Sequence, residues 1–136
     1  MIDSMIMRHI IIVVLFLFSQ GASAQMEANK FLKFDTEHYT LGTLKKGDKK
    51  TFEYTFKNDG KDAIEIDIVS ACECTELDWT RGKIAPGGEG KIYVSFDSTE
   101  KESSETVDVD MTLLNTDPKT GYPIFKIVTF DFILKD

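Results

Sequence analysis

The feature that most constrains this chain is an alternation of apolar and polar side chains, which starts near Phe31 and runs to the end of the sequence. It is clearest over residues 51–58, where aromatic side chains take every second position and polar side chains take the positions between them. Successive side chains of a strand point to opposite faces, so this pattern predicts a half-buried strand. The same alternation predicts further strands over residues 64–68, 92–96, 107–113 and 124–134.

Turn residues separate these strands. Asn58-Asp59-Gly60 predicts a short turn into the next strand, where Ile64, Ile66 and Ile68 are expected to share one face. The chain from residue 70 to Gly88 is expected to be irregular.

The first strand is expected over residues 31–34 and 39–44, with a break between them. About seven short strands without a helical period favour an all-β fold, an immunoglobulin-like antiparallel β-sandwich of two packed sheets. A chain of 136 residues has room for one such domain.

The N-terminal 24 residues have the three parts of a secretory signal peptide: Arg8 near the start, an apolar run from Ile10 to Phe18, and small residues before Ala24. This pattern predicts a cleavable signal helix over residues 1–24, cleavage before Gln25 and a mature domain over residues 25–136. A membrane anchor is the alternative, but the apolar run is much shorter than the ~20 residues that cross a bilayer as a helix. We therefore expect an exported protein, periplasmic or extracellular, whose mature part has no stable membrane span.

The charge of the chain argues against nucleic-acid binding. Its 16 basic and 23 acidic residues leave a formal net charge of -7, which opposes attraction to phosphate groups and anionic lipids. The partner expected from the sequence is instead an unknown protein or an envelope component.

The two cysteines of the chain, Cys72 and Cys74, are two residues apart. In an extended segment their Cα atoms would lie about 6.6 Å apart, near the upper limit for a disulfide, so a bond between them requires a local turn. Packed thiols or a local disulfide would be structural. Two thiolates would suit Cu(I), with Glu73, Glu76 and Asp78 as poor additional ligands, and a small disulfide loop could serve redox chemistry. These alternatives remain open at the level of the sequence.

No arrangement of residues predicts catalysis or a bound cofactor. His38 is the one histidine of the mature chain, and a surface histidine in a turn is its simplest interpretation. The chain has no Gly-x-Ser-x-Gly elbow, phosphate-binding glycine loop or His-Glu-x-x-His helix. We expect a protein that is not an enzyme.

Trp79, the single tryptophan, follows the cysteines closely. It is expected to cap the sandwich core, or else to stand exposed as a binding anchor. With Glu76 and Asp78 it forms the set of candidate partner-binding residues.

A family resemblance is carried by short stretches between residues 31 and 135: 34–35, 41–48, 52–60, 68–75, 79, 84–90 and 92–97. In this order they resemble the bacterial exported family called domain of unknown function 1573, itself similar to the ASH and major-sperm-protein branch of immunoglobulin-like domains. Glu73 departs from the family, which often has glycine between the two cysteines, and the hairpin at residues 117–123 is longer than usual. The resemblance implies a β-sandwich in the envelope and no established activity, whereas ASH-like relatives generally serve as interaction modules.

Two hypotheses follow for function. The first is a non-catalytic exported β-sandwich that binds another protein or an envelope component through an exposed sheet edge or the loop from Cys72 to Trp79. The second is a thiol-dependent copper-binding or redox protein that uses Cys72 and Cys74.

Overall fold

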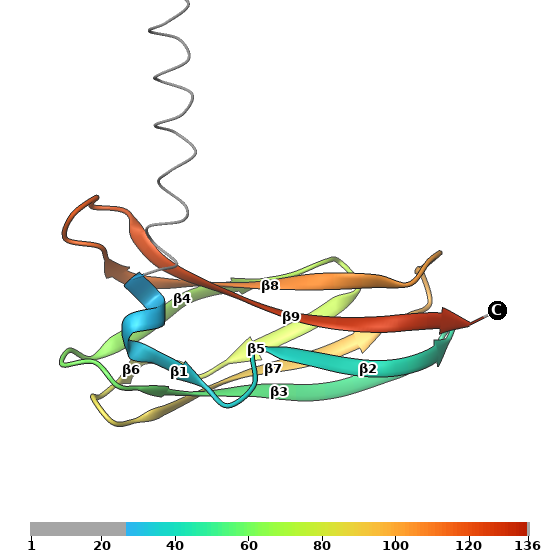
Figure 1. The fold of residues 1–136 in the computed structure, drawn as a ribbon, viewed down its shortest axis with the longest axis horizontal. Helices are drawn as coiled ribbons and strands as arrows, with labels where there is room; N and C mark the ends of the chain where they lie inside the picture. Colours follow the sequence, from blue (N-terminus) through green and yellow to red (C-terminus); the bar gives the residue numbers. More distant parts are fainter. Residues whose placement is uncertain (1–26, 136) are drawn as a thin grey trace, which may run out of the picture.

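The computed structural model describes residues 27–135, which fold into two β-sheets packed face to face (Figure 1). The predicted signal segment lies outside the described residues. Nine strands follow a short helical turn at residues 27–31. They are β1 (Leu32–Phe34), β2 (His38–Lys45), β3 (Lys49–Asn58), β4 (Ile64–Ser70), β5 (Thr75–Trp79), β6 (Lys83–Ile84), β7 (Glu89–Asp97), β8 (Glu105–Thr116) and β9 (Pro123–Lys135).

The strands form a four-stranded sheet in the order β1-β3-β7-β5 and a five-stranded sheet in the order β2-β9-β8-β4-β6. The predicted all-β sandwich is confirmed. The strand number exceeds about seven because β1 and β6 have only three and two residues, and because β5 forms where the sequence predicts irregular chain. Neighbouring strands are antiparallel except β2 and β9, which are parallel.

The break predicted within the first strand separates two strands of different sheets. β1 pairs with β3 in one sheet, and β2 pairs with β9 in the other. Between them, Asp35 donates its amide to the Thr55 carbonyl and Glu37 accepts the Thr129 amide, at 3.0 and 2.9 Å. The N-terminal segment therefore ties the two sheets together at one side of the sandwich.

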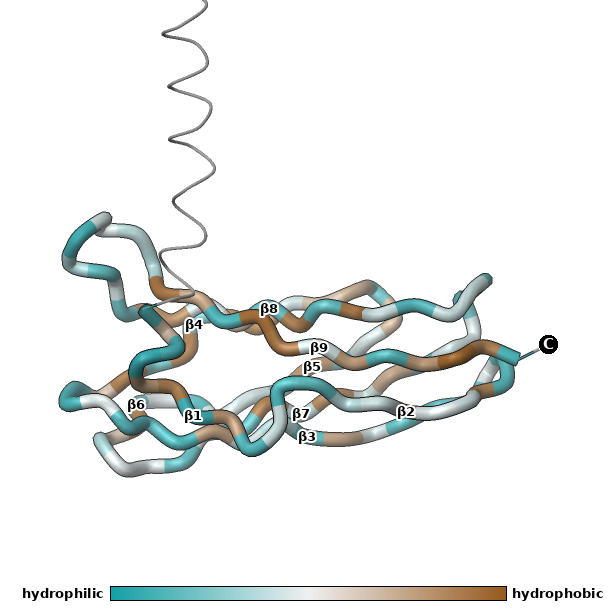
Figure 2. The backbone as a smooth tube through the Cα atoms, in the orientation of Figure 1, coloured by the Kyte–Doolittle hydropathy of each residue, from teal (hydrophilic) through white to brown (hydrophobic). Residues whose placement is uncertain are grey.

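The core forms between the sheets because alternate residues turn inward. Tyr54, Phe56 and Phe96 of the four-stranded sheet are fully buried, and so is Phe130 on the facing sheet. The Phe96 and Phe130 ring centroids lie 5.3 Å apart in an edge-on arrangement, which adds about 0.5–1.5 kcal/mol to the burial of apolar area. Figure 2 shows hydrophobic and hydrophilic segments following one another along β8 and β9, as this alternation requires.

The expected alternation fails in β4. Ile64 and Ile66 are buried as predicted, but Ile68 is 52% exposed and Val69 takes the inward position. The pairing of β4 with β8 shifts between Ile66 and Ile68, so an extra residue, Asp67, reverses the faces beyond it.

The short turn predicted after β3 connects the two sheets, and β3 and β4 are not paired with each other. Asn58 is fully buried, and its side-chain amide donates to the carbonyl oxygens of Asp62 and Ile84 at 2.9 and 3.1 Å. Its side-chain oxygen, Oδ1, accepts a hydrogen bond from the Gly60 amide. The asparagine thus holds this connection in place through its side chain.

Lys126 is an inward-facing lysine on β9 and is only 3% exposed. Its Nζ contacts Glu37 Oε1 and Asn29 Oδ1, both at 2.5 Å. These partners belong to the segment before β2, where Ala28 is also fully buried. The lysine therefore fastens the N-terminal segment to the sandwich. No helix among residues 27–135 is long and apolar enough to cross a membrane.

Candidate functional site

The two cysteines lie in a tight turn between β4 and β5. Their sulfur atoms are at disulfide distance and their Cα atoms are 5.2 Å apart, closer than an extended chain would place them. The Cys72 carbonyl accepts both the amide and the hydroxyl of Thr75, at 3.0 and 2.7 Å, which closes the turn. Glu73 has no positive φ, so this turn forms without the glycine that the family often has there.

The disulfide limits what the cysteine pair can do. Metal binding by cysteine requires thiolates, so Cu(I) could bind Cys72 and Cys74 only after the bond is reduced. Among residues 27–135, no group of three or more histidine, cysteine, aspartate or glutamate side chains is placed to hold a metal ion.

Strand β5 follows the turn and carries all three candidate partner-binding residues. Glu76 and Asp78 are exposed on the outer face of the four-stranded sheet, and Trp79 is partly buried against the core on the other face. The Arg81 guanidinium stacks 3.9 Å from the centre of the Trp79 ring. Trp79 therefore caps the core, which was the first of the two roles expected for it, and does not share a face with Glu76.

Asp78 is held in place by two donors. Its Oδ1 accepts the Trp79 amide at 2.9 Å and the Arg81 guanidinium at 3.1 Å. The amide and then the guanidinium lower the pKa of this carboxyl, so Asp78 stays charged at neutral pH.

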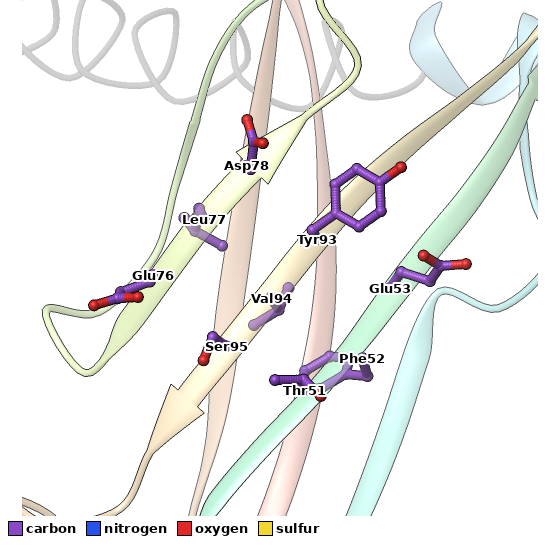
Figure 3. A pocket seen from close by; sticks show the side chains of 9 residues that line it. All are labelled: Thr51, Phe52, Glu53, Glu76, Leu77, Asp78, Tyr93, Val94 and Ser95. Carbon is purple, nitrogen blue, oxygen red and sulfur yellow. The ribbon is translucent and has the colours of Figure 1, made fainter.

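An open groove of about 600 Å³ lies over the outer face of β3, β7 and β5 (Figure 3). Tyr93 stands within it and is 44% exposed, between Glu53 on β3 and Asp78 on β5. A second groove of about 450 Å³ adjoins the cysteine turn and is lined by Glu73 and Cys74 among others.

Acidic side chains dominate both grooves. Their linings hold six carboxylates and one lysine; the carboxylates are Glu53, Glu73, Glu76, Asp78, Asp97 and Glu100. We call these six residues the acidic face.

Part of the acidic face is neutralised locally. Glu53 pairs with Lys91 at 2.8 Å, Asp78 pairs with Arg81 at 3.1 Å, and Asp97 lies 3.8 Å from Lys49. The Thr99 hydroxyl and amide, more than the lysine, lower the pKa of Asp97. Within residues 27–135, Glu73 and Glu76 form no ion pair, so a surplus of negative charge remains beside β5.

His38 lies in β2 and not in a turn. Its Nδ1 is 2.6 Å from the Thr129 hydroxyl and its Nε2 is 2.6 Å from Asp131 Oδ2, both on the neighbouring strand β9. His38 and Asp131 are partly exposed, with 44% and 33% of their side chains accessible. This row of three side chains links the two parallel strands across the surface of the five-stranded sheet.

The sequence placed Cys72, Cys74, Glu76, Asp78 and Trp79 close together along the chain, and the structure keeps them together at one edge of a sheet. The sequence did not predict strand β5 itself. Thr75, Leu77 and Trp79 do alternate with the two acids, but a pattern of five residues beside a cysteine pair is short for predicting a strand.

Solved structures with a similar fold include a protein of unknown function from Porphyromonas gingivalis W83, at 16% identity and a TM-score of 0.61, covering 76% of this chain and 46% of that one. The VesB protease of Vibrio cholerae is 14% identical with a TM-score of 0.59, over 77% of this chain and 32% of that one. The chain thus spans less than half the length of both. At these identities the similarity concerns the fold alone.

An ASH/PapD-like domain of human CEP192 is also similar, at 11% identity and a TM-score of 0.53, covering 77% of this chain and 84% of that domain. No curated protein matches the sequence. The family model described as "Protein of unknown function (DUF1573)" matches residues 32–126, from β1 to the first residues of β9. The chain therefore belongs to the DUF1573 family, as its motifs indicated.

Proposed function

We propose that this protein is a non-catalytic, exported binding domain, which holds another protein or an envelope component at strand β5 and the adjoining turn of Cys72 to Thr75. The observation that carries this proposal is the one-sided pairing of β5. It pairs with β7, and among residues 27–135 no strand pairs with its other side. Such an edge is a ready template for an added strand of a partner.

Two further observations support the proposal. The acidic face and its two grooves lie directly beside this edge, so a partner on β5 would also meet charged and aromatic side chains. Export is supported by the signal-like segment of residues 1–24, which would deliver the domain to a compartment where the disulfide persists.

Site-specific photo-crosslinking tests the binding role. A photoreactive amino acid replaces Glu76 on β5 in the full chain, produced in the source organism, and the matched control carries it at Asp108 on the outer face of the other sheet. We expect a discrete adduct from position 76 that is absent from position 108. Equal adducts from both positions, or none from position 76, would contradict the proposal.

Export is tested on the same material. The mature protein should appear in the periplasm or the medium with Gln25 as its first residue, which mass spectrometry of the intact chain shows. A protein that stays in the cytoplasm with its first 24 residues would contradict it.

The disulfide favours a second candidate function, thiol–disulfide exchange. A substrate dithiol would be oxidised to a disulfide while Cys72 and Cys74 take up the two electrons and two protons as thiols, through a mixed disulfide. In the Cys74→Ser variant, the Cys72 thiol should attack the disulfide form of the substrate and remain joined to it as a mixed disulfide, while the second substrate sulfur leaves as a thiol, because the cysteine that would release the substrate is missing. Absence of such a conjugate, with unchanged crosslinking at position 76, would leave binding as the function.

A further inference from the structure

We infer that the edge of β5 binds an extended, lysine- or arginine-rich segment of its partner as an added antiparallel strand. This inference rests on the proposed function and specifies the chemistry of the partner. It follows from the backbone groups of β5, from the shape of the other sheet edges and from the charge of the acidic face.

The register of β5 against β7 shows which backbone groups point outward. The Cys74 carbonyl accepts the Asp97 amide and the Thr80 amide donates to the Lys91 carbonyl. Hydrogen-bonded and non-bonded pairs alternate along an antiparallel ladder, so residues 74, 76, 78 and 80 bond to β7 and residues 75, 77 and 79 point away from it.

Leu77 is therefore the centre of the open edge. The Thr75 amide already donates a hydrogen bond to the Cys72 carbonyl, and the Trp79 amide donates one to the Asp78 carboxylate. Among the described residues, the Leu77 amide and carbonyl have no strand partner on that side. They are the donor and acceptor that an added strand would engage first.

The other edge strands are poor templates. β1 and β6 have three and two residues, too short for a stable ladder. The pairing of β2 is shifted between Thr40 and Thr43, where Gly42 has a positive φ of 79°. β5 has five regular residues with no lysine, proline or bulge, and the charged side chains that it does carry, Glu76 and Asp78, repel an acidic strand but not a basic one.

The charges beside the edge identify the occupant. Two copies of β5 paired around Leu77 would place Glu76 of one copy opposite Asp78 of the other, and like charges directly opposite each other destabilise a sheet. A second copy of this chain is therefore a poor occupant. A strand with cationic side chains on its outer face would instead meet Glu76 and reach Glu73, which have no ion pair among residues 27–135, and would lie beside Asp78, which Arg81 already contacts.

The inner face of the added strand has a different requirement. Its side chains would lie beside Leu77 and Trp79, which are partly buried and pack against the core. Small or β-branched residues fit there. The expected ligand is thus a segment in which basic residues alternate with threonine, valine or alanine.

A peptide of about eight residues, slightly longer than β5, in which lysine alternates with threonine, provides the probe. Its fluorescence anisotropy is measured with the mature chain. We expect saturable binding that weakens about tenfold when salt rises from about 0.05 to 0.5 M, because the paired charges become screened. Glutamate–threonine and proline-interrupted lysine–threonine peptides of equal length should not bind.

Two pairs of protein variants separate the backbone from the charge. Leu77→Pro removes the outward amide, and Leu77→Ala removes the same side chain but keeps the amide, so binding should be lost only in the proline variant. Glu76→Lys should weaken binding at least about tenfold, whereas Asp108→Lys, with the same change in net charge on the other sheet, should not. Circular dichroism confirms that each variant is folded.

Hydrogen exchange gives a direct readout in the unmodified protein. The Leu77 amide should become protected when the lysine–threonine peptide binds. Equal binding of the lysine and glutamate peptides would overturn the basic partner, and binding that survives Leu77→Pro would overturn the added strand. Either result could occur while the crosslink at position 76 persists, so failure of this inference is distinguishable from failure of the proposed function.

Discussion

Gly90 of β7 lies opposite Phe56 of β3, and the Phe56 ring occupies the space that a side chain at position 90 would need. A Cβ there would also lie 2.7 Å from Ile84 Cδ1, closer than side chains pack. We expect Gly90→Ala to lower the free energy of unfolding by about 1–3 kcal/mol through overpacking. Urea denaturation of the variant and the wild type measures this loss of unfolding free energy. Glu89→Ala, on the exposed side of the same strand, should cost little, and equal losses in both variants would contradict the explanation.

The hydroxyl of Tyr54 joins the two sheets, since it donates to the Thr129 carbonyl at 2.6 Å. Tyr54→Phe leaves that oxygen without this donor and should cost about 1–2 kcal/mol in unfolding free energy. Tyr122 is 58% exposed, so Tyr122→Phe is the matched control and should cost almost nothing.

The same tyrosine predicts a pH dependence. Burial raises the pKa of Tyr54 above its usual value of about 10, so the folded state resists its ionisation while the unfolded state does not. Its contribution to stability is complete below about pH 10 and declines as the pH rises further. Tyrosinate absorbance during alkaline titration should show one tyrosine that ionises only on unfolding. Ionisation of all tyrosines near pH 10 in the folded protein would contradict this.

The disulfide should contribute little to stability. It closes a loop of only three residues, from Cys72 to Cys74, so its effect on the unfolded chain amounts to at most about 2 kcal/mol. A thiol reagent should find no free thiol in the native protein and two after reduction. The Cys72→Ser, Cys74→Ser double variant should stay folded, with the stability of the reduced wild type. Unfolding on reduction would show a larger structural role.

Lys126 should control the order of the N-terminal segment. Lys126→Met keeps much of the side-chain volume but removes the contacts to Asn29 and Glu37. Amide exchange over residues 27–37 should become faster, with a smaller change in the strands of the core. Lys119→Met, on an exposed turn, is the control. Unchanged exchange in the segment would mean that Ala28 and its neighbours hold it without the lysine.

The side-chain alternation predicted most of the sandwich, because burying one face of a strand leaves a direct imprint on the sequence. β3, β7, β8 and β9 follow that pattern through residues such as Phe56, Phe96 and Val109. The exception is Ile68, where one extra residue reversed the faces. A bulge depends on how the neighbouring strand pairs, and local periodicity does not contain that information.

Other features lay beyond the sequence because they depend on distant residues. Lys126 occupies the same face of β9 as the inward-facing Ile124 and Val128, but a lysine can be buried there only because it forms an ion pair with Glu37. The open edge of β5 is likewise a property of strand order. The sequence did locate the candidate residues, since Glu76, Asp78 and both cysteines lie within one short stretch.

Strand β9 lies between β2 and β8, so the last long strand of the described chain is an interior member of its sheet. Tyr39 pairs with Phe130, about ninety residues later in the chain. Contacts of such long sequence separation form slowly, because a large loop must close first. A nascent chain therefore cannot complete the five-stranded sheet until β9 has emerged from the ribosome. Until then β2, which pairs only with β9 in that sheet, lacks the strand that holds it there, even though the four-stranded sheet needs no part of β9.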